Sequence, residues 1–434
     1  MASSASARDL LVRGIAAAKA GSKQEATFFL EWVLRTEGAP DQHLEAWWWL
    51  SQVSNDPVEK RRYLEEVLAR NPSDHRARRA LAILDGRLKP ETIVEADRVP
   101  ERQPISGGEA PAERFKCPRC GGRLTAAKQG STLQCAYCGW RRDLVSGGQH
   151  DSPAGREFVV AMAGVTAHRR PQDARTFRCQ ACGAPYQLAP EALSLTCAHC
   201  GSTYTVEQSD SEELIPPDGV IPFRLTRVEA ARALATDPRQ RAKNPELDSA
   251  GSRLVGVYFP LWSFNMSGQV RWSGMRYDEN RKKWVSVSGS ELVLESEYLV
   301  PASPRFSTRW LRGALVFDLK DARSFEPAFL VDWPAETYQI PMSDAAVTAH
   351  AEVFDKIRQR ATLGTPERLR DVRFDSTGFS IDSFRLLLAP VWTEPAPSAG
   401  SMVRRIVNGQ TGAVASSPAT QGWLARLLGG AKER

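Results

Sequence analysis

The sequence predicts a multidomain protein of the α+β class, and three observations lead to this prediction. Apolar residues recur at helical spacing in residues 8–88. All eight cysteines follow in the middle of the chain, in two sets with one spacing. Strand patterns with a few helices then fill residues 215–415. We therefore expect N-terminal α-helical repeats, two small cysteine-rich β modules and a C-terminal α+β domain that is mainly antiparallel.

Length and composition are those expected of an ordinary soluble protein. The 434 residues suffice for about two to four domains, and 42% of them are hydrophobic and 25% charged. The formal net charge of +6 is small for this length, so overall charge gives little support to nucleic-acid binding. No apolar run approaches the roughly 18 residues of a membrane span, and the N-terminus lacks the basic start of a signal peptide. We expect a cytoplasmic location.

Residues 8–88 contain an internal repeat. A shift of 34 positions aligns three pairs of apolar residues: Phe29 with Tyr63, Leu30 with Leu64, and Val33 with Val67. This shift equals the tetratricopeptide period, and the turn at 71–74 is typical of that family. The segment resembles a tetratricopeptide array of about two units, with an irregular helical bundle as the alternative. The resemblance implies a concave face that holds a protein or peptide partner.

Residues 89–113 separate these helices from the cysteines. Proline, glycine and charged residues are mixed there without periodicity, so we expect a linker. The first cysteine module is expected at 114–142 and the second at 176–207. A connecting segment at 143–175 would space them.

The eight cysteines form a duplication. Each set reads C-x2-C, fourteen residues, C-x2-C, and every cysteine of the second set lies 62 positions after its counterpart. The first set is Cys117, Cys120, Cys135 and Cys138, and the second is Cys179, Cys182, Cys197 and Cys200. Two cysteines separated by two residues can point both sulfurs at one tetrahedral ion. Each set therefore predicts a zinc ribbon that holds one structural Zn²⁺ ion.

Other interpretations of the cysteines are a disulfide framework and redox or iron chemistry. Disulfide frameworks are typical of small secreted domains, and nothing in this chain indicates secretion. His199 lies inside the last cysteine turn and could in principle be a further ligand. Because four thiolates already complete a tetrahedral site, we interpret it as a spacer side chain. Such closed sites leave no open coordination position, and the chain has no G-x-S-x-G or H-E-x-x-H motif. We therefore expect a protein that is not an enzyme.

The first ribbon is basic. Its residues that could contact phosphates are Arg114, Lys116, Arg119, Arg123, Arg141 and Arg142. These basic groups are interspersed with Phe115, Tyr137 and Trp140. Proteins that bind single-stranded nucleic acid combine such basic groups with aromatic rings. The alternative is that the aromatic rings cap the small core of the ribbon while the basic side chains are solvated.

The C-terminal domain is predicted at 215–415. Thr226 and Glu229 form a capping box that begins a helix, and a second helix is expected from Ser343 to about residue 360. Strands are expected at 254–264, 269–277, 283–287, 291–300, 379–388 and 402–407. The last strand enters Asn408-Gly409, a hairpin turn whose residues tolerate positive φ.

A short amphipathic tail is expected at 421–434. Its apolar residues at helical spacing are Trp423, Leu424, Leu427 and Leu428. A helix this short is marginal in water, so it would fold against a partner groove or an anionic membrane surface. A frayed tail, or one docked on the chain's own β-rich domain, is the alternative. Peripheral attachment at the inner face of the membrane is therefore one expectation for location.

Several motifs resemble one group of bacterial zinc-ribbon proteins. They are Ile221-Pro222-Phe223, Glu229-Ala230, residues 256–264 and residues 407–412. Members are named transcription factor IIB-type or primosomal-helicase-like zinc-ribbon proteins, and they are similar to the zinc-ribbon component of phage-shock-type stress operons. The resemblance covers residues 115–415. This chain departs from it in its N-terminal helices, in lacking the hydrophobic C-terminal segment of some relatives, and in having no phosphate-binding loop.

These features predict a non-enzymatic zinc-ribbon adaptor or scaffold that mediates protein–protein interactions. The resemblance implies a place in a bacterial membrane-stress assembly. The alternative is a nucleic-acid-binding factor that acts through the basic first ribbon.

Overall fold

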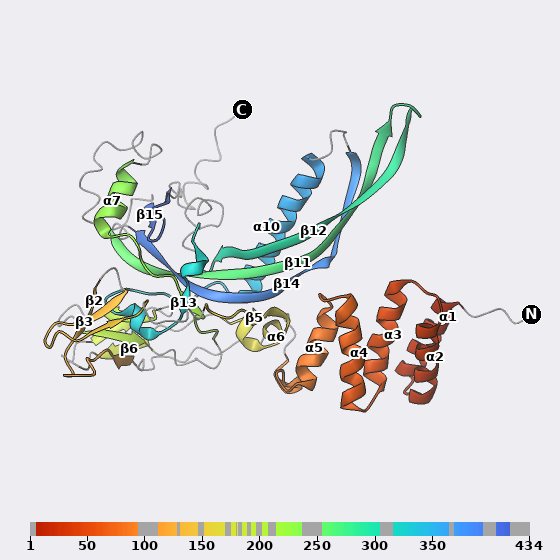
Figure 1. The fold of residues 1–434 in the computed structure, drawn as a ribbon, viewed down its shortest axis with the longest axis horizontal. Coiled ribbons are helices and arrows are strands. Elements are labelled where there is room, and N and C mark those ends of the chain that lie inside the picture. Colours follow the sequence, from red (N-terminus) through yellow and green to blue (C-terminus); the bar gives the residue numbers. More distant parts are fainter. Residues whose placement is uncertain are drawn as a thin grey trace, which may run out of the picture.

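The molecule combines a helical region, small sheets and one long bent sheet (Figure 1). The computed structural model describes residues 6–93, 112–127, 131–145, 152–169, 175–178, 180, 185–188, 192–196, 202–206, 214–236, 254–303, 316–363, 369–393 and 405–416. N-terminal helices, mixed sheets and a C-terminal sheet-rich region make this an α+β protein, as predicted. The helices lie at one end of the molecule and the small sheets at the other.

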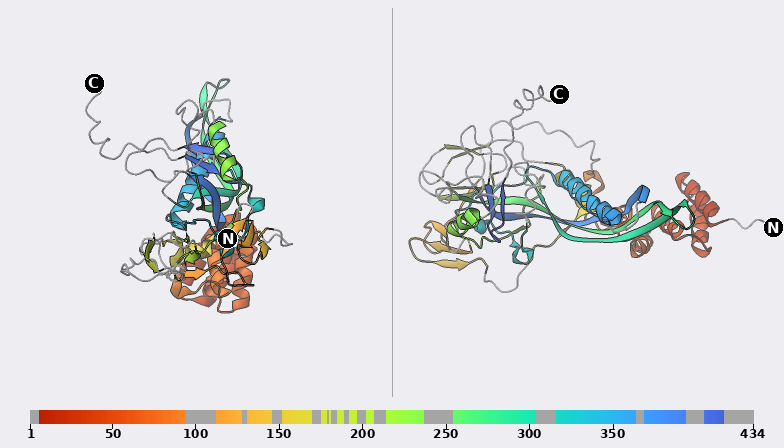
Figure 2. Two further views of the ribbon diagram at one scale, coloured as in Figure 1. Left: turned by 90° about the vertical axis from the view of Figure 1, so that its left-hand side faces the viewer. Right: turned by 90° about the horizontal axis from the view of Figure 1, so that it is seen from above.

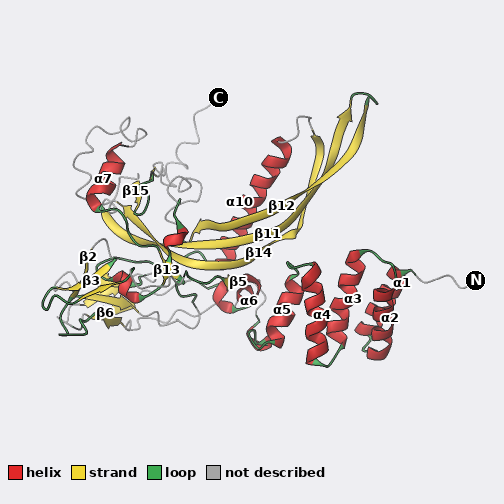
Figure 3. Cartoon of the chain, in the orientation of Figure 1, coloured by secondary structure: helices red, strands yellow, loops and turns green. Residues whose placement is uncertain are grey.

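The described N-terminal residues fold into successive helices. They are α1 (Ala7–Lys19), α2 (Lys23–Arg35), α3 (Pro40–Val53), α4 (Pro57–Arg70) and α5 (His75–Leu84). Each helix packs against the next (Figure 3). The hydroxyl of Ser6 accepts a hydrogen bond from the N–H of Asp9 (3.2 Å) and so caps α1. Leu10, Leu30 and Leu50 are buried between the helices, because their spacing places them on the inner faces.

The two cysteine-rich segments contain short strands. They are β1 (Ala112–Arg114), β2 (Leu124–Ala127), β3 (Thr132–Cys135), β4 (Arg141–Asp143), β6 (Arg175–Arg178), β7 (Pro185–Leu188), β8 (Ser194–Thr196) and β9 (Thr203–Val206). β2, β3 and β4 form one antiparallel sheet, and β6 pairs with β7. β1 precedes the first cysteines yet pairs with β9, which follows the last cysteines. This pairing, which we did not predict, joins the two segments.

Long strands form the main sheet of the C-terminal domain. They are β11 (Val255–Asp278), β12 (Lys283–Pro301) and β14 (Leu369–Thr393), with β11 in the middle and both pairings antiparallel. Shorter strands extend the sheet beyond β14: β10 (Gly219–Val220), β13 (Arg323–Ser324), β15 (Arg405–Asn408) and β16 (Val414–Ser416). β15 and β16 form the predicted hairpin, but residues 409–413 connect the strands, and Gly412 adopts positive φ where Asn408 and Gly409 were expected to do so.

Strands that we predicted separately are continuous. β11 runs through residues 265–268, and β12 runs through residues 288–290, where breaks were expected. The register between these strands shifts between Phe264 and Met266, so a bulge absorbs the irregular residues and no turn forms. β14 begins ten residues before the predicted 379–388 (379 minus 369), because β11 pairs with it along that length.

In the described residues of the C-terminal domain, two α-helices pack on or beside the main sheet. α7 (Arg227–Thr236) begins at the predicted capping box, where the N–H of Glu229 donates to the hydroxyl of Thr226 (3.2 Å). α10 (Met342–Leu363) covers one face of the sheet and packs on the buried ring of Trp262. The indole Nε1–H of Trp262 donates to the carbonyl of Ile340 (2.9 Å), so the ring is buried without an unpaired donor.

The connecting segment attaches the helical region to the sheet. β5 (Arg156–Glu157) pairs with β14, and α6 (Phe158–Met162) contacts both α5 and β14. Arg78 of α5 forms an ion pair with Asp382 of β14 (3.1 Å), and Arg87 forms one with Glu157 (2.5 Å). The helices therefore lie against the lower side of the sheet in the left-hand view of Figure 2.

Candidate metal centre and neighbouring surfaces

The first four cysteines converge on one point. The Sγ atoms of Cys117, Cys120, Cys135 and Cys138 all lie within 4.8 Å of one another. The Cys117–Cys138 and Cys120–Cys135 Sγ distances are 3.6 and 3.5 Å. A tetrahedral ion with metal–sulfur bonds of about 2.3 Å requires sulfurs about 3.8 Å apart. This group can therefore hold one metal ion.

Two tight turns aim the sulfurs. The N–H of Gly121 donates to the carbonyl of Cys117 (2.8 Å), and the N–H of Gly139 donates to the carbonyl of Cys135 (3.1 Å). Both glycines adopt positive φ, at +70° and +69°. A side chain would be strained in that region, so the glycine after each C-x2-C pair lets the turn close.

Hydrogen bonds shift the pKa values of two of the four thiols in opposite directions. The backbone N–H groups of Cys138 and Tyr137 stabilise the Cys135 thiolate and lower its pKa to about 6. The N–H of Gly122 acts in the same sense on Cys120, but hydrogen bonds with the thiols of Cys138 and Cys135 outweigh it and raise the pKa of Cys120 to about 12. Four thiolates this close repel one another, so the arrangement favours a bound cation.

The cysteine group packs on the C-terminal domain. Cys117 and Cys135 are buried together with Leu124 and Leu133 of the same small sheet. Their cluster includes Val331, which follows the short helix η7 (Pro327–Leu330) and is fully buried. The cysteine turns therefore lie against a neighbouring domain and are not a free module.

Asp332 joins three parts of the chain. Its carboxylate accepts hydrogen bonds from Arg123 (3.3 Å) and from the backbone N–H of Ala126 (2.9 Å) in the first cysteine segment. It also accepts one from the hydroxyl of Thr203 in β9 (3.3 Å). Asp332 adopts φ +63°, a strained conformation that this set of contacts holds in place. No local signal in the sequence marks this residue.

The second predicted metal site lies outside the described residues. This applies to Cys179, Cys182, Cys197 and Cys200, and to His199. The strands that flank them are described, and Ser194 of β8 donates to the carbonyl of Trp333 (2.7 Å). The second segment therefore also contacts the C-terminal domain.

The basic residues of the first segment divide into two groups. Arg123 pairs with Asp332 (3.3 Å), and Arg142 pairs with Glu326 (2.8 Å), so both face the C-terminal domain. Lys116, Arg119 and Arg141 are exposed, and Arg114 is half-buried.

The aromatic residues of this segment are of two kinds, packed and exposed. Phe115 and Trp140 pack against the small core around the cysteines. Tyr137 is 79% exposed and lies beside Gly122. Two of the three rings thus cap the core, and one remains on the surface.

A groove opens on the helical region. It has a volume of about 390 Å³, and its lining residues are Glu31, Leu34, Arg35, Trp47, Arg62, Tyr63 and Glu66. The guanidinium of Arg70 lies 4.0 Å from the centre of the Trp47 ring. Glu31 is paired with Arg35 (3.3 Å), whereas Arg62 is exposed and lies over the Tyr63 ring (4.9 Å). The groove is therefore lined mainly by charged groups, with the half-buried ring of Trp47 among them.

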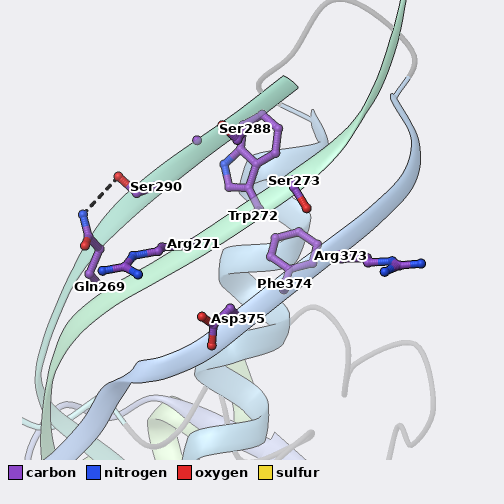
Figure 4. Close-up of a pocket in the computed structure, with 10 residues that line it drawn as sticks. Gln269, Arg271, Trp272, Ser273, Ser288, Ser290, Arg373, Phe374 and Asp375 are labelled. Carbon is purple, nitrogen blue, oxygen red and sulfur yellow. Dashed lines mark hydrogen bonds between the residues drawn. The ribbon is translucent and has the colours of Figure 1, made fainter. Parts of the chain in front are cut away.

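A second hollow lies on the main sheet (Figure 4). Its volume is about 540 Å³, and it is formed where β11, β12 and β14 run side by side. Arg271, Arg373 and Asp375 supply its charge, and Gln269 donates to the hydroxyl of Ser290 (3.0 Å). We did not predict this hollow, because β14 is distant in sequence from the hairpin that β11 and β12 form.

The tail predicted to bind a groove or a membrane lies outside the described residues. Its residues Trp423, Leu424, Leu427 and Leu428 belong to the segment after Ser416. Among the described helices, none combines the length and the apolar character needed to cross a membrane.

The chain is distantly similar to a bacterial protein of unknown function. The uncharacterized protein YdjG of Bacillus subtilis (strain 168) is 23% identical over 340 residues, which cover 73% of this chain and 94% of that protein. No family model matches the chain, and no solved structure matches it.

Proposed function

We propose that this chain is a non-enzymatic zinc-ribbon adaptor that holds partner proteins on a rigid scaffold. The observation that carries the proposal is a closed four-cysteine group packed against the C-terminal domain, at the opposite end of the molecule from an open groove on helices. A metal surrounded by four thiolates has no free position for a substrate, so its role is to stabilise the fold.

Zinc is the proposed metal at two sites per chain. Four thiolates in a tetrahedral arrangement are a soft ligand set that suits Zn²⁺. The first site comprises the cysteines between 117 and 138, and the repeated spacing supports an equivalent site between 179 and 200. When bound, zinc would tie each pair of turns together.

The helical region is proposed to bind the partner. Its period resembles that of tetratricopeptide repeats, which present grooves to peptides. In the groove, the half-buried ring of Trp47 offers apolar area and the exposed guanidinium of Arg62 offers a hydrogen-bond donor. Because Arg78 and Asp382 hold α5 on the sheet, a partner in this groove would be fixed relative to the ribbons.

We expect Arg62→Glu to weaken retention of groove-bound partners at least about tenfold, because it reverses the charge at the rim of the groove. The measurement is a quantitative pull-down from the native host with the full chain. Arg79→Glu is the matched control, since Arg79 is also exposed but lies on α5 away from the groove. If both variants retain the same proteins as the wild type, the groove is not the partner site.

We further propose that the chain acts in the cytoplasm, near the inner face of the membrane. Its resemblance to the zinc-ribbon component of phage-shock-type stress operons supports this location. That resemblance also includes transcription factor IIB-type zinc-ribbon proteins, which leads to the second candidate function.

The second candidate is a nucleic-acid-binding factor. The observation that favours it is the exposed ring of Tyr137 close in the chain to exposed Lys116, Arg119 and Arg141. An exposed aromatic ring can stack on a base while basic groups contact phosphates. Arg123 and Arg142 weigh against it, because they already pair with Asp332 and Glu326.

Under this second candidate, Arg119→Glu with Arg141→Glu should weaken binding to single-stranded DNA and RNA of any sequence. Affinity of the wild type should also fall steeply with salt, with a slope of about −0.7 for each phosphate contact. Fluorescence anisotropy at several salt concentrations measures both effects, with Arg79→Glu as the control. If the wild type binds no nucleic acid at low salt, the adaptor proposal stands alone.

A further inference from the structure

β12 is an edge strand. In the described part of the chain it pairs with β11 on one side, and no strand pairs with its other side. Figure 1 shows it along the outer margin of the long bent sheet. An edge strand presents a row of unpaired N–H and C=O groups, which can pair with a strand of another chain.

Two leucines on this strand are almost fully exposed. Leu292 is 82% exposed and Leu294 is 77% exposed. Side chains two positions apart lie on the same face of a strand, so the two leucines form one apolar patch. Val293, between them, points to the other face and is buried under α10. Natural edge strands usually carry charges or proline where these leucines stand.

The sequence around the leucines is palindromic. Residues 290–296 read Ser-Glu-Leu-Val-Leu-Glu-Ser, with Val293 at the centre. When two copies of a strand pair antiparallel about a two-fold axis, each residue faces the one at equal distance on the other side of the centre. With the axis at Val293, Leu292 of one copy faces Leu294 of the other, and the serines at 290 and 296 also face each other.

The palindrome would place Glu291 opposite Glu295, and α10 compensates their charge. Glu295 pairs with Lys356 (3.0 Å), and Glu291 pairs with Arg360 (3.8 Å). Like charges directly opposite each other would otherwise destabilise the pairing. The two cations of each copy therefore balance the two carboxylates of each copy.

We propose that two copies of this chain associate through β12, in antiparallel register centred on Val293. The bulge that shifts the β11 register, with Glu297 at φ +58°, bounds the regular pairing at the end of the palindrome. Because Ser296 already lies in this bulge, residues 291–295 pair regularly in each copy, and these five residues are a normal strand length. Four leucines form an apolar cluster on the face opposite α10, and the two main sheets become continuous.

The hydroxyl of Ser290 marks the face on which the leucines lie. It accepts a hydrogen bond from Gln269 (3.0 Å), and Figure 4 shows both side chains on β12 and β11. Leu292 and Leu294 follow Ser290 at two-residue steps, so they continue this face along the edge. The second copy would therefore cover apolar surface next to the hollow of the sheet.

Charged substitutions at Leu292 and Leu294 test the proposed register between the two copies of β12. In Leu292→Lys with Leu294→Lys, each lysine of one copy would face a lysine of the other, so association should weaken at least about 100-fold. In Leu292→Lys with Leu294→Glu, each lysine would face a glutamate, so association should recover at least about tenfold. A register with Leu292 facing Leu292 would give no such recovery, because lysine would face lysine.

Sedimentation equilibrium of the full zinc-loaded chain measures these effects, and circular dichroism checks the fold of each variant. Val58→Lys is the matched control, because Val58 is 74% exposed and lies on α4. The expected result is a dimer for the wild type and for Val58→Lys. The proposal is overturned if the wild type is monomeric at about 100 μM, if the double-lysine variant dimerises like the wild type, or if the lysine–glutamate variant associates no better than the double-lysine variant.

Discussion

Removing the metal is expected to unfold the first cysteine segment and to release it from the C-terminal domain. Binding of zinc to four-cysteine peptides contributes about 10–16 kcal/mol, and the folding of such small modules depends on it. In the described residues of this segment, 112–127 and 131–145, the buried residues are few, chiefly Leu124 and Leu133 beside the cysteines. Without the ion, this core is too small to keep the segment folded.

The loss should extend to the contacts at Asp332 but not to the helical region. Val331 and Asp332 touch the metal-binding segment directly. The helices are attached elsewhere, through Arg78 to Asp382 and Arg87 to Glu157. Chelation should therefore expose residues 112–145 and 175–206 to proteolysis while α1 to α5 stay protected.

Metal analysis and limited proteolysis before and after chelation check this prediction. Freshly purified protein should contain about two zinc ions per chain, one for each four-cysteine set. Adding zinc back should restore protection, which separates metal loss from irreversible damage. A metal-free protein with disulfides and unchanged protection would contradict the prediction and the structural role of the metal.

The first cysteine group could be predicted from the sequence because its geometry is local. Each C-x2-C turn is closed by hydrogen bonds within a few residues, as between Gly121 and Cys117 (2.8 Å). The convergence of two turns follows from a short antiparallel sheet, in which β2 pairs with β3. Spacing alone therefore indicates the ligand set.

The long strands could not be predicted because their continuity is not local. Residues 265–268 of β11 are Asn, Met, Ser and Gly, which favour a break when only neighbours in the chain are considered. In the fold, the side chain of Asn265 instead donates to Ser383 (2.9 Å) and accepts from the N–H of Glu297 (2.8 Å). Partners more than thirty residues away in sequence hold the strand together across the bulge.

The individual residues that meet at these surfaces could not be predicted for the same reason. Asp332 acts through Arg123, Ala126 and Thr203, which belong to segments far from it in the chain. The helical groove likewise brings Glu31 of α2 beside Tyr63 of α4. Charge counts and periodicity describe one segment at a time, so they do not reveal which distant side chains meet.

Gly268→Ala is expected to destabilise the C-terminal domain by about 3 kcal/mol or more. Gly268 adopts φ +138°, a conformation that side chains rarely adopt. A Cβ atom there would lie 1.9 Å from the carbonyl oxygen of Gly378, which belongs to the backbone of β14. Strands β11 and β14 would have to move apart beside the buried core that α10 covers, and the local pairing would be lost.

Gly164→Ala provides the control for this change. The Cβ atom at Gly164 would meet its nearest neighbour at 3.5 Å, an ordinary contact, so the expected effect is within about 0.5 kcal/mol. Hydrogen exchange of the β11 amides measures the local free energy of opening, which is preferable to one melting temperature in a chain with several domains. Faster exchange should be centred on residues 264–270 and their partners in β14. Equal exchange in both variants would mean that the close approach of Gly268 and Gly378 does not limit the stability of the sheet.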